Sequence, residues 1–233
     1  GRMTRPVTLV LELDDTPLST ELQGFIGEMV ALSNGKLNSV AVDAAGVITA
    51  EDGSSAPTSL TVGEPLAVTL PDGAELPVYG SLDDSGRAQF DVAGVLPSAR
   101  PVVLMCVPAE NSEAGTLLFT GLAFHGVPSG HEFNSFVLGL YNAAGPGQPL
   151  GDDLIERAKS ITDPLNIMIL AQRIASLNPN VRAEAYDVAH FPELKDQYGA
   201  MSVPCIVINQ PGGEQKVEFG KKSVPQMLTL LGA

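Results

Sequence analysis

Apolar positions in this chain recur with two spacings, and the changes from one spacing to the other outline short strands and helices. Alternating or continuous β-branched runs predict strands at 7–13, 37–42, 101–107, 116–124 and 181–188, and a hairpin at 206–209 and 215–219. Apolar residues three and four apart predict helices at 131–144, 152–160, 164–177 and 192–198. Two further helices are predicted around the stripes Leu22, Phe25, Ile26, Met29, Val30 and Val224, Met227, Leu228, Leu231.

Local signals place several helix ends. Thr20 with Gln23 and Ser223 with Gln226 have the spacing of a capping box, which predicts helix starts at those points. Asp163 before Pro164 predicts another start, since aspartate caps well and proline suits the first helical position. Asn34-Gly35 predicts an end, and so does Gly199.

The predicted elements fall into two similar halves, 3–148 and 149–233. In the first half the order is strand, helix, strand, strand, strand, helix. Residues 44–98 interrupt it with a stretch rich in Gly, Pro, Asp and Ser, which predicts a β-rich insertion because so long a plain loop is uncommon. Pro101 and Pro204 each open an apolar strand, which favours an internal duplication.

Composition narrows the function classes. The 233 residues are 44% hydrophobic and 17% charged, as in a folded globular protein, and the net charge of −14 argues against nucleic acid and anionic membranes. No apolar run approaches the ~20 residues that span a bilayer. No signal peptide is visible, and Gly1-Arg2 before Met3 resembles a cloning remnant. With only Cys106 and Cys205, both in apolar runs, a reducing cytoplasm is the simplest compartment.

The segment Met201–Asn209 carries the most specific local pattern. Its Ser202-Val203-Pro204 step leads into the β-branched run Cys205–Asn209, which is typical of the cis-proline strand of a thioredoxin-like domain. Such a strand faces a Cys-x-x-Cys pair at a helix start, and the chain contains no such pair.

A second segment, Gly126–Leu138, resembles the Gly-x-Pro-x-Gly-His-Glu-Phe-Thr-Ser-Leu-Val-Leu segment in the N-terminal domain of the bacterial alkyl hydroperoxide reductase F subunit. The segments Arg5–Asp15, Ala175–Asn180 and Ser202–Asn209 are also similar to parts of that domain. The resemblance covers nearly the whole chain except 44–98.

The resemblance implies an α/β fold of two fused thioredoxin-like domains, each a mixed sheet flanked by helices, the first with the β-rich insertion. In that family the second domain carries Cys-x-x-Cys and relays electrons from a flavin-containing pyridine-nucleotide reductase module to a peroxiredoxin. This chain has no Gly-x-Gly-x-x-Gly after a strand, so FAD and NAD(P)H are expected only through a partner or a following module. Peroxiredoxin and flavoprotein disulfide reductase are the implied partners, without nucleic acid or membrane; a homodimer is an alternative to a monomer.

The chain departs from the family where the redox turn is expected. The family places a strand and then Cys-x-x-Cys between the helix ending near Ser160-Ile161 and the helix at Pro164, but here Lys159–Pro164 runs straight through. We therefore expect both the cysteines and the strand to be absent. Two explanations stay open: this half has been rebuilt, or the molecule holds residues that the sequence omits.

Six residues are candidates for a site in this reading. Cys205 is either a lone thiol near the groove or a small apolar core residue. Glu132 is either a proton donor and acceptor during thiol exchange or a first-turn acid stabilised by the helix dipole. The remaining four are expected to line the substrate groove, Thr162 and Asp163 serving otherwise as a helix cap: Val203, Pro204, Thr162, Asp163. His125, His131 and His190 lack ligand spacing, so no metal site is expected.

Two functions follow as hypotheses. The first is a thioredoxin-like domain of a peroxide-detoxifying disulfide reductase system that relays electrons between a flavoprotein reductase and a peroxiredoxin. The second is a redox-inactive thioredoxin-like module that binds a protein partner. The first requires the missing cysteines, whereas the second takes the sequence literally.

Overall fold

The computed structural model describes most of the chain outside the predicted insertion. Described are residues 3–42, 99–108, 117–162, 165–168, 172–178, 180–202, 204–210 and 214–233, with the short pieces 47–50, 55–57, 60–61, 66–69, 75–78, 81–82 and 88–89. None of the helices in this described part is both long and apolar enough to span a membrane.

The first half contains most of its expected elements. Its strands outside the insertion are β1 (Val7–Glu12), β2 (Leu37–Val42), β10 (Val102–Pro108) and β11 (Leu117–His125), and its helices are α1 (Pro17–Leu32) and α2 (His131–Ala144). The second half contains α3 (Asp152–Lys159), β12 (Leu165–Met168), α4 (Gln172–Ala175), β13 (Val181–Tyr186), α5 (Glu193–Tyr198), β14 (Cys205–Asn209), β15 (Gln215–Phe219) and α6 (Val224–Leu230).

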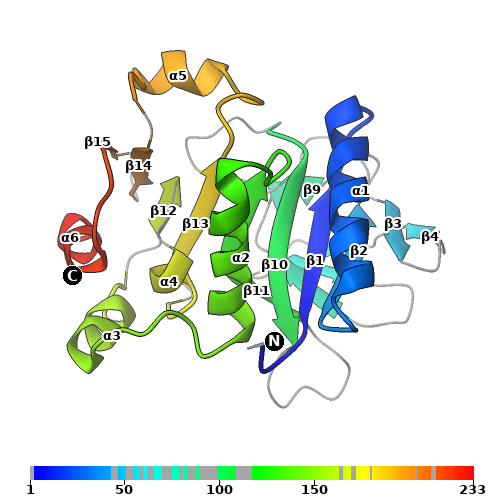
Figure 1. Cartoon of the computed structure of the whole chain (residues 1–233), viewed down its shortest axis with the longest axis horizontal. Helices are drawn as coiled ribbons and strands as arrows, with labels where there is room; N and C mark the ends of the chain where they lie inside the picture. Colours follow the sequence, from blue (N-terminus) through cyan, green and yellow to red (C-terminus); the bar gives the residue numbers. More distant parts are fainter. Residues whose placement is uncertain are drawn as a thin grey trace.

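Ten strands join in one mixed sheet that runs through both halves, in the order β15-β14-β12-β13-β11-β10-β1-β2-β3-β4 (Figure 1). Within the first half, β1 is parallel to β2 and antiparallel to β10, which is antiparallel to β11. The second half repeats this arrangement: β12 is parallel to β13 and antiparallel to β14, which is antiparallel to β15. The expected α/β class with a mixed sheet and flanking helices is confirmed.

The seam between the halves is the parallel pair β11 and β13. Because of it, the buried apolar side chains of both halves form one continuous core. Leu9, Leu22 and Ile26 lie in this core in the first half, and Ile167 and Ile174 lie in it in the second.

The start of α1 differs from the prediction. Thr16, not Thr20, is the N-cap: its hydroxyl accepts from the backbone N–H of Ser19, and Pro17 opens the helix. Proline at the first helical position pre-sets φ, so the helix begins one turn earlier than the Thr20–Gln23 spacing suggested. The predicted end is confirmed, because Asn34 and Gly35 both have positive φ and stop the helix.

The largest correction concerns residues 164–177, which are not one helix. Residues 165–168 form the strand β12, which lies between β13 and β14, and among the described residues of this range only Gln172–Ala175 are helical. The expected loss of the central strand is therefore wrong. The sequence Leu165–Met168 is apolar with one interruption, which suits a strand or a helix equally, and pairing on both sides decides for the strand.

The insertion is β-rich wherever it is described. The pieces are β3 (Val47–Ala50), β4 (Ser55–Pro57), β5 (Leu60–Thr61), β6 (Leu66–Thr69), β7 (Glu75–Val78), β8 (Ser81–Leu82) and β9 (Ala88–Gln89). β3 and β4 extend the main sheet beyond β2, whereas β5, β6 and β7 form a separate small sheet.

Candidate functional site

In the fold, the position of the expected redox turn is the end of β12. The sequence had indicated Lys159–Pro164, which precedes β12. β12 ends at Met168 and α4 begins at Gln172, so residues 169–171 connect the strand to the helix. Those residues are Ile, Leu and Ala. A thiolate at this position would need a cysteine at the helix start, and none is present in the sequence there.

Cys205 opens β14, close in register to the end of β12, where Met168 pairs with Val207. Its side chain is buried in an apolar cluster with Met168, Tyr198 and Val207. Burial raises the pKa of the Cys205 thiol. A protonated, buried thiol is a poor nucleophile, so the position of Cys205 favours a packing role.

Cys106 lies in the middle of β10 and is fully buried. Burial raises the pKa of its thiol to about 12. Both cysteines are free.

Pro204 directly precedes β14 and is half-buried, and its carbonyl oxygen accepts a hydrogen bond from the backbone N–H of Gly220 at 2.9 Å. Two apolar side chains near it are unusually open: Met201 is 95% exposed, and Phe219, which pairs with Cys205, is 43% exposed. The expected cis bond between Val203 and Pro204 lies outside the described residues, as does Val203 itself. The corresponding bond of the first half, Arg100–Pro101, is cis.

Thr162 does not lie at a helix start. It is exposed in the connection between α3 and β12, at the opposite end of β12 from residues 169–171. That connection is held by Asn178, whose side-chain amide donates to the carbonyl oxygens of Ala158 and Ile161. The helix start that motivated a groove role for Thr162 and Asp163 is therefore absent; Asp163 lies outside the described residues.

Glu132 is half-buried in the first turn of α2, as the helix-dipole interpretation requires. It follows β11, whereas Cys205 opens β14, and β13 and β12 lie between these two strands. At about 4.8 Å per strand, the two strands are roughly 14 Å apart. The fold therefore does not bring the two candidate catalytic residues together.

The first half has a buried ion pair at the position that corresponds to the redox turn. Glu12 ends β1, and its carboxylate contacts the guanidinium of Arg100, which directly precedes the cis-proline Pro101. Burial raises the pKa of Glu12 to about 7, although Arg100 opposes the shift.

Asp14 lies just beyond this ion pair and organises the start of α1. Its carboxylate accepts hydrogen bonds from the hydroxyls of Thr16 and Ser19. Burial alone would raise the pKa of Asp14, but these hydrogen bonds outweigh it and hold the pKa below its usual value.

A second buried polar cluster crosses the seam between the halves. The side chain of Glu184 on β13 is fully buried. Its carboxylate lies 2.8 Å from the guanidinium of Arg182 and 3.5 Å from Nε2 of His125 on β11, and it accepts a hydrogen bond from the Tyr186 hydroxyl at 2.9 Å. The His125 ring stacks on Tyr186, and its Nδ1 lies 2.7 Å from the carbonyl oxygen of Ala99.

The charges in this cluster act on one another. Burial alone would raise the pKa of Glu184, but Arg182 and then His125 outweigh it and lower the pKa. Burial and the neighbouring Glu184 raise the pKa of Tyr186. Since Arg100 and Ala99 are adjacent, one loop contacts both Glu12 and His125 and so joins the two polar clusters.

Sequence reasoning missed both clusters. Their signal is a single acidic residue in a mainly apolar strand, Glu12 at the end of β1 and Glu184 in β13, where Arg182 is the other charged residue. Such acidic residues are rarely buried without a partner. In the described part of the chain, no group of His, Cys, Asp and Glu is arranged to hold a metal ion.

Comparisons with known proteins add to this geometry. No family model matches the chain. The alkyl hydroperoxide reductase F subunit of Pseudomonas aeruginosa is 30% identical over 155 residues, which is 57% of this chain and 30% of the relative. The F subunit of Staphylococcus epidermidis is 27% identical over 128 residues, 49% of this chain and 24% of the relative. The match thus spans less than a third of these relatives.

Solved structures match over nearly the whole chain. A structure of the alkyl hydroperoxide reductase F subunit of Enterococcus faecalis has a TM-score of 0.66 at 29% identity, covering 99% of this chain and 92% of that one. The crystal structure of the NTD_N/C domain of the same protein has a TM-score of 0.65 at 27% identity, with the same coverage.

A protein disulfide oxidoreductase from Aeropyrum pernix has a TM-score of 0.61 at 18% identity, covering 98% of this chain and 85% of that one, which shows a shared fold alone. In sequence and in fold, the chain is therefore similar to the N-terminal, thioredoxin-like domain of the bacterial alkyl hydroperoxide reductase F subunit.

Proposed function

We propose that this chain is a redox-inactive thioredoxin-fold component of a peroxide-detoxifying disulfide reductase system, in which it binds protein partners. One observation carries the proposal: the connection from β12 to α4 contains no cysteine, while the strands around it are intact. Thiol exchange needs one thiolate to attack and a second thiol to resolve the mixed disulfide. Cys205 and Cys106, both buried, do not supply that pair.

The binding surface in this proposal is the end of β14. Met201 and Phe219 present apolar side chains to solvent near Pro204, and exposed apolar side chains that gather on a surface favour protein contacts. In this proposal, Val203 and Pro204 line the groove that receives the partner. Partners of the expected classes are a peroxiredoxin and a flavoprotein disulfide reductase, so FAD and NAD(P)H belong to the partner or to a further module.

The electron relay is the second candidate. The similarity to an F-subunit structure over 99% of the chain favours it. It requires a Cys-x-x-Cys that the sequence lacks. Two free thiols fit a reducing compartment such as the cytoplasm.

Three measurements distinguish the candidates. The intact mass of the expressed chain should be near 24.3 kDa, whereas a larger mass would reveal residues omitted between β12 and α4. Insulin disulfides should not be reduced with dithiothreitol as donor. Turnover that survives Cys205→Ser would overturn the redox-inactive proposal and support the relay.

Binding tests the other part of the proposal. Immobilised chain should capture a peroxiredoxin or a flavoprotein disulfide reductase of this system, and Met201→Asp should weaken capture at least about tenfold by placing a charge in the apolar surface. Leu32→Asp is the matched control, since Leu32 is 82% exposed at the far end of α1. Equal capture by both variants would exclude this surface, and no capture by the unmodified chain would exclude the binding function.

A further inference from the structure

The two edges of the ten-stranded sheet differ in their capacity to pair with another strand. β15 (Gln215–Phe219) is the last strand at one edge, and among the described strands only β14 pairs with it (Figure 1). The strand at the opposite edge, β4, has three residues and ends with Pro57, which lacks the N–H that a further strand would need. β15 has five residues and no proline. An edge strand of this kind is a template for pairing with another chain.

The register with β14 shows which backbone groups of β15 point outward. Gly220 and Glu214, at the two ends of the pair, are both hydrogen-bonded through their backbone to the β14 segment. Because such bonds involve every second residue of an antiparallel pair, the even-numbered residues bond to β14. The odd-numbered residues Gln215, Val217 and Phe219 therefore direct their N–H and C=O groups away from the sheet, where a further strand would meet them.

The side chains of β15 are complementary to those of a second β15. Its sequence is Gln-Lys-Val-Glu-Phe, so Lys216 and Glu218 lie at equal distances on either side of Val217. When two copies pair antiparallel with Val217 opposite Val217, Lys216 of each copy lies opposite Glu218 of the other. Opposite charges directly across antiparallel strands stabilise the pair, and like charges destabilise it.

The same charges select the register. A shift of two residues in either direction keeps the outward N–H and C=O groups opposite one another, but it places Lys216 opposite Lys216 or Glu218 opposite Glu218. The register centred on Val217 pairs all five residues of the strand and both charges. It is symmetric, as pairing between identical copies about a two-fold axis requires.

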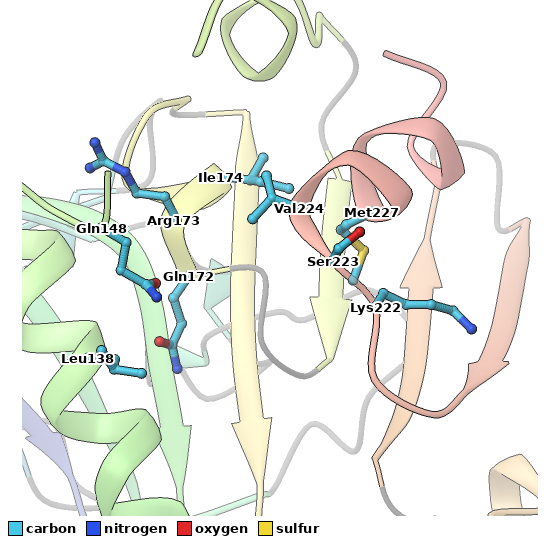
Figure 2. Close-up of a pocket in the computed structure, with 9 residues that line it drawn as sticks. All are labelled: Leu138, Gln148, Gln172, Arg173, Ile174, Lys222, Ser223, Val224 and Met227. Carbon is cyan, nitrogen blue, oxygen red and sulfur yellow. The ribbon is translucent and has the colours of Figure 1, made fainter. Parts of the chain in front are cut away.

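The charge distribution of the whole chain also favours this edge. The net charge is −14, so two copies repel one another, yet three of the 13 basic residues lie within seven positions: Lys216, Lys221, Lys222. Figure 2 shows the Lys222 side chain extending away from Leu138 and Gln172, out from the turn before α6. Its ammonium donates to the carbonyl oxygen of Phe219 at 2.8 Å and lies 3.2 Å from Glu218. The positive charge that reduces repulsion between copies is therefore next to the outward backbone groups.

We propose that β15 pairs antiparallel with β15 of a second copy of this chain, about a two-fold axis at Val217. The N–H of Gln215 then replaces Lys222 at the carbonyl oxygen of Phe219, and Lys222 keeps its contact with Glu218. The interface closes on itself, so assembly stops at two copies. Each side contributes five residues from the strand, against the roughly 20–30 of a standard interface, so the dimer is weak, with a Kd on the order of 100 μM. The inference is independent of the proposed function, because its test uses the chain alone.

Sedimentation equilibrium of charge variants tests the pairing. Between about 5 μM and about 1 mM, the average mass of the parent should rise from 24.3 kDa toward twice that value. Lys216→Glu and Glu218→Lys should each weaken the dimer at least about tenfold, because each dimer contains the charge pair twice. Net charge alone would weaken only the first variant and strengthen the second. A 1:1 mixture of the two variants should dimerise like the parent, since opposite charges again lie across the strands.

Backbone and surface variants complete the test. Val217→Pro removes the outward N–H at the centre and should abolish the dimer, while the even-numbered residues keep their bonds to β14. Lys36→Glu and Glu28→Lys make the same charge changes at exposed positions of the first half and should dimerise like the parent. Thermal unfolding shows that each variant is folded. A parent that stays at 24.3 kDa at about 1 mM, a single β15 variant that dimerises like the parent, or a 1:1 mixture that stays monomeric would each overturn the proposal.

Discussion

The two crossovers of this molecule join equivalent pairs of parallel strands in different ways. The first, between β1 and β2, has a capped helix of 16 residues and a buried ion pair at its start. The second, between β12 and β13, has a four-residue helix and no cysteine in the turn before it (Figure 1). A parallel crossover needs about a dozen residues, so residues 169–180 are near the lower limit.

The comparison shows that strand pairing and redox chemistry depend on different parts of the crossover. β12 keeps both neighbours, and Ile167 is fully buried, so the sheet survives with one turn of helix. Thiol chemistry depends on a cysteine at the start of a helix, where the dipole favours the thiolate. Shortening the crossover therefore removes the chemistry and leaves the fold.

The largest expected difference between the halves concerns their thiols. Cys106 and Cys205 lie on the corresponding strands β10 and β14, but only Cys205 is near a strand end. We expect Cys205 in the native protein to react with a disulfide reagent at least about 100-fold faster than Cys106, which needs global unfolding to react. Cys205→Ser should remove the faster phase. Equal rates would mean that β10 opens as readily as β14.

Removal of Glu184 should have a large effect on stability. Glu184→Ala leaves Arg182 buried without its carboxylate and removes the acceptor of Tyr186, so we expect a loss of about 3–5 kcal/mol in the free energy of unfolding by urea. Glu214→Ala, at an exposed position, should change it by less than about 0.5 kcal/mol. A small loss in Glu184→Ala would mean that the seam is held by apolar packing alone.

Core truncations compare the crossovers directly. Leu9 in β1 and Ile167 in β12 are both fully buried. Leu9→Ala should cost about 3–5 kcal/mol because α1 fixes Leu22 and Ile26 above it, whereas Ile167→Ala should cost about 2–3 kcal/mol because the shorter α4 can relax into the space. Urea denaturation of both variants measures the difference, and a larger loss in Ile167→Ala would contradict it.

Much of the fold could be predicted from the spacing of apolar residues. The strand Leu37–Val42 and the helix His131–Ala144 have the expected bounds, and Ser223 with Gln226 forms the expected capping box. These elements combine a clear period with end signals that agree with it. The helix expected at 164–177 failed because a four-residue apolar strand and a short helix together imitate one longer helix, and only pairing with β13 and β14 separates them.

The site was less accessible from sequence. Pro204 and Cys205 were found by pattern, but Glu12, Arg100, His125 and Glu184 were not. Those four come together through the pairing of β1 with β10, of β10 with β11 and of β11 with β13. Contacts between residues so far apart in sequence have no local spacing from which they could be inferred.

Glu12 should make the first crossover sensitive to pH. Its pKa of about 7 in the folded protein is above the ordinary 4.5, so the folded state holds the proton more tightly. Stability from this group is therefore full below about pH 4.5 and falls as pH rises through 7, by up to about 3 kcal/mol. Urea midpoints at pH 5 and pH 8 measure the loss. Glu12→Gln should reduce it and Glu214→Gln should not; an unchanged profile in Glu12→Gln would assign the pH dependence elsewhere.

The smallest expected effect concerns the first residues of the two helices. Thr16→Ala removes the N-cap of α1 and one donor to Asp14, so it should lower the free energy of unfolding by about 1 kcal/mol. Gln172→Leu removes a buried amide nitrogen that has no partner, so it should be neutral or stabilise the protein by up to about 1 kcal/mol. Urea denaturation gives both values. A loss of stability in Gln172→Leu would mean that the amide already stabilises the folded protein. In that case the start of α4 would hold no unpaired donor, and polar groups would stabilise the starts of both helices.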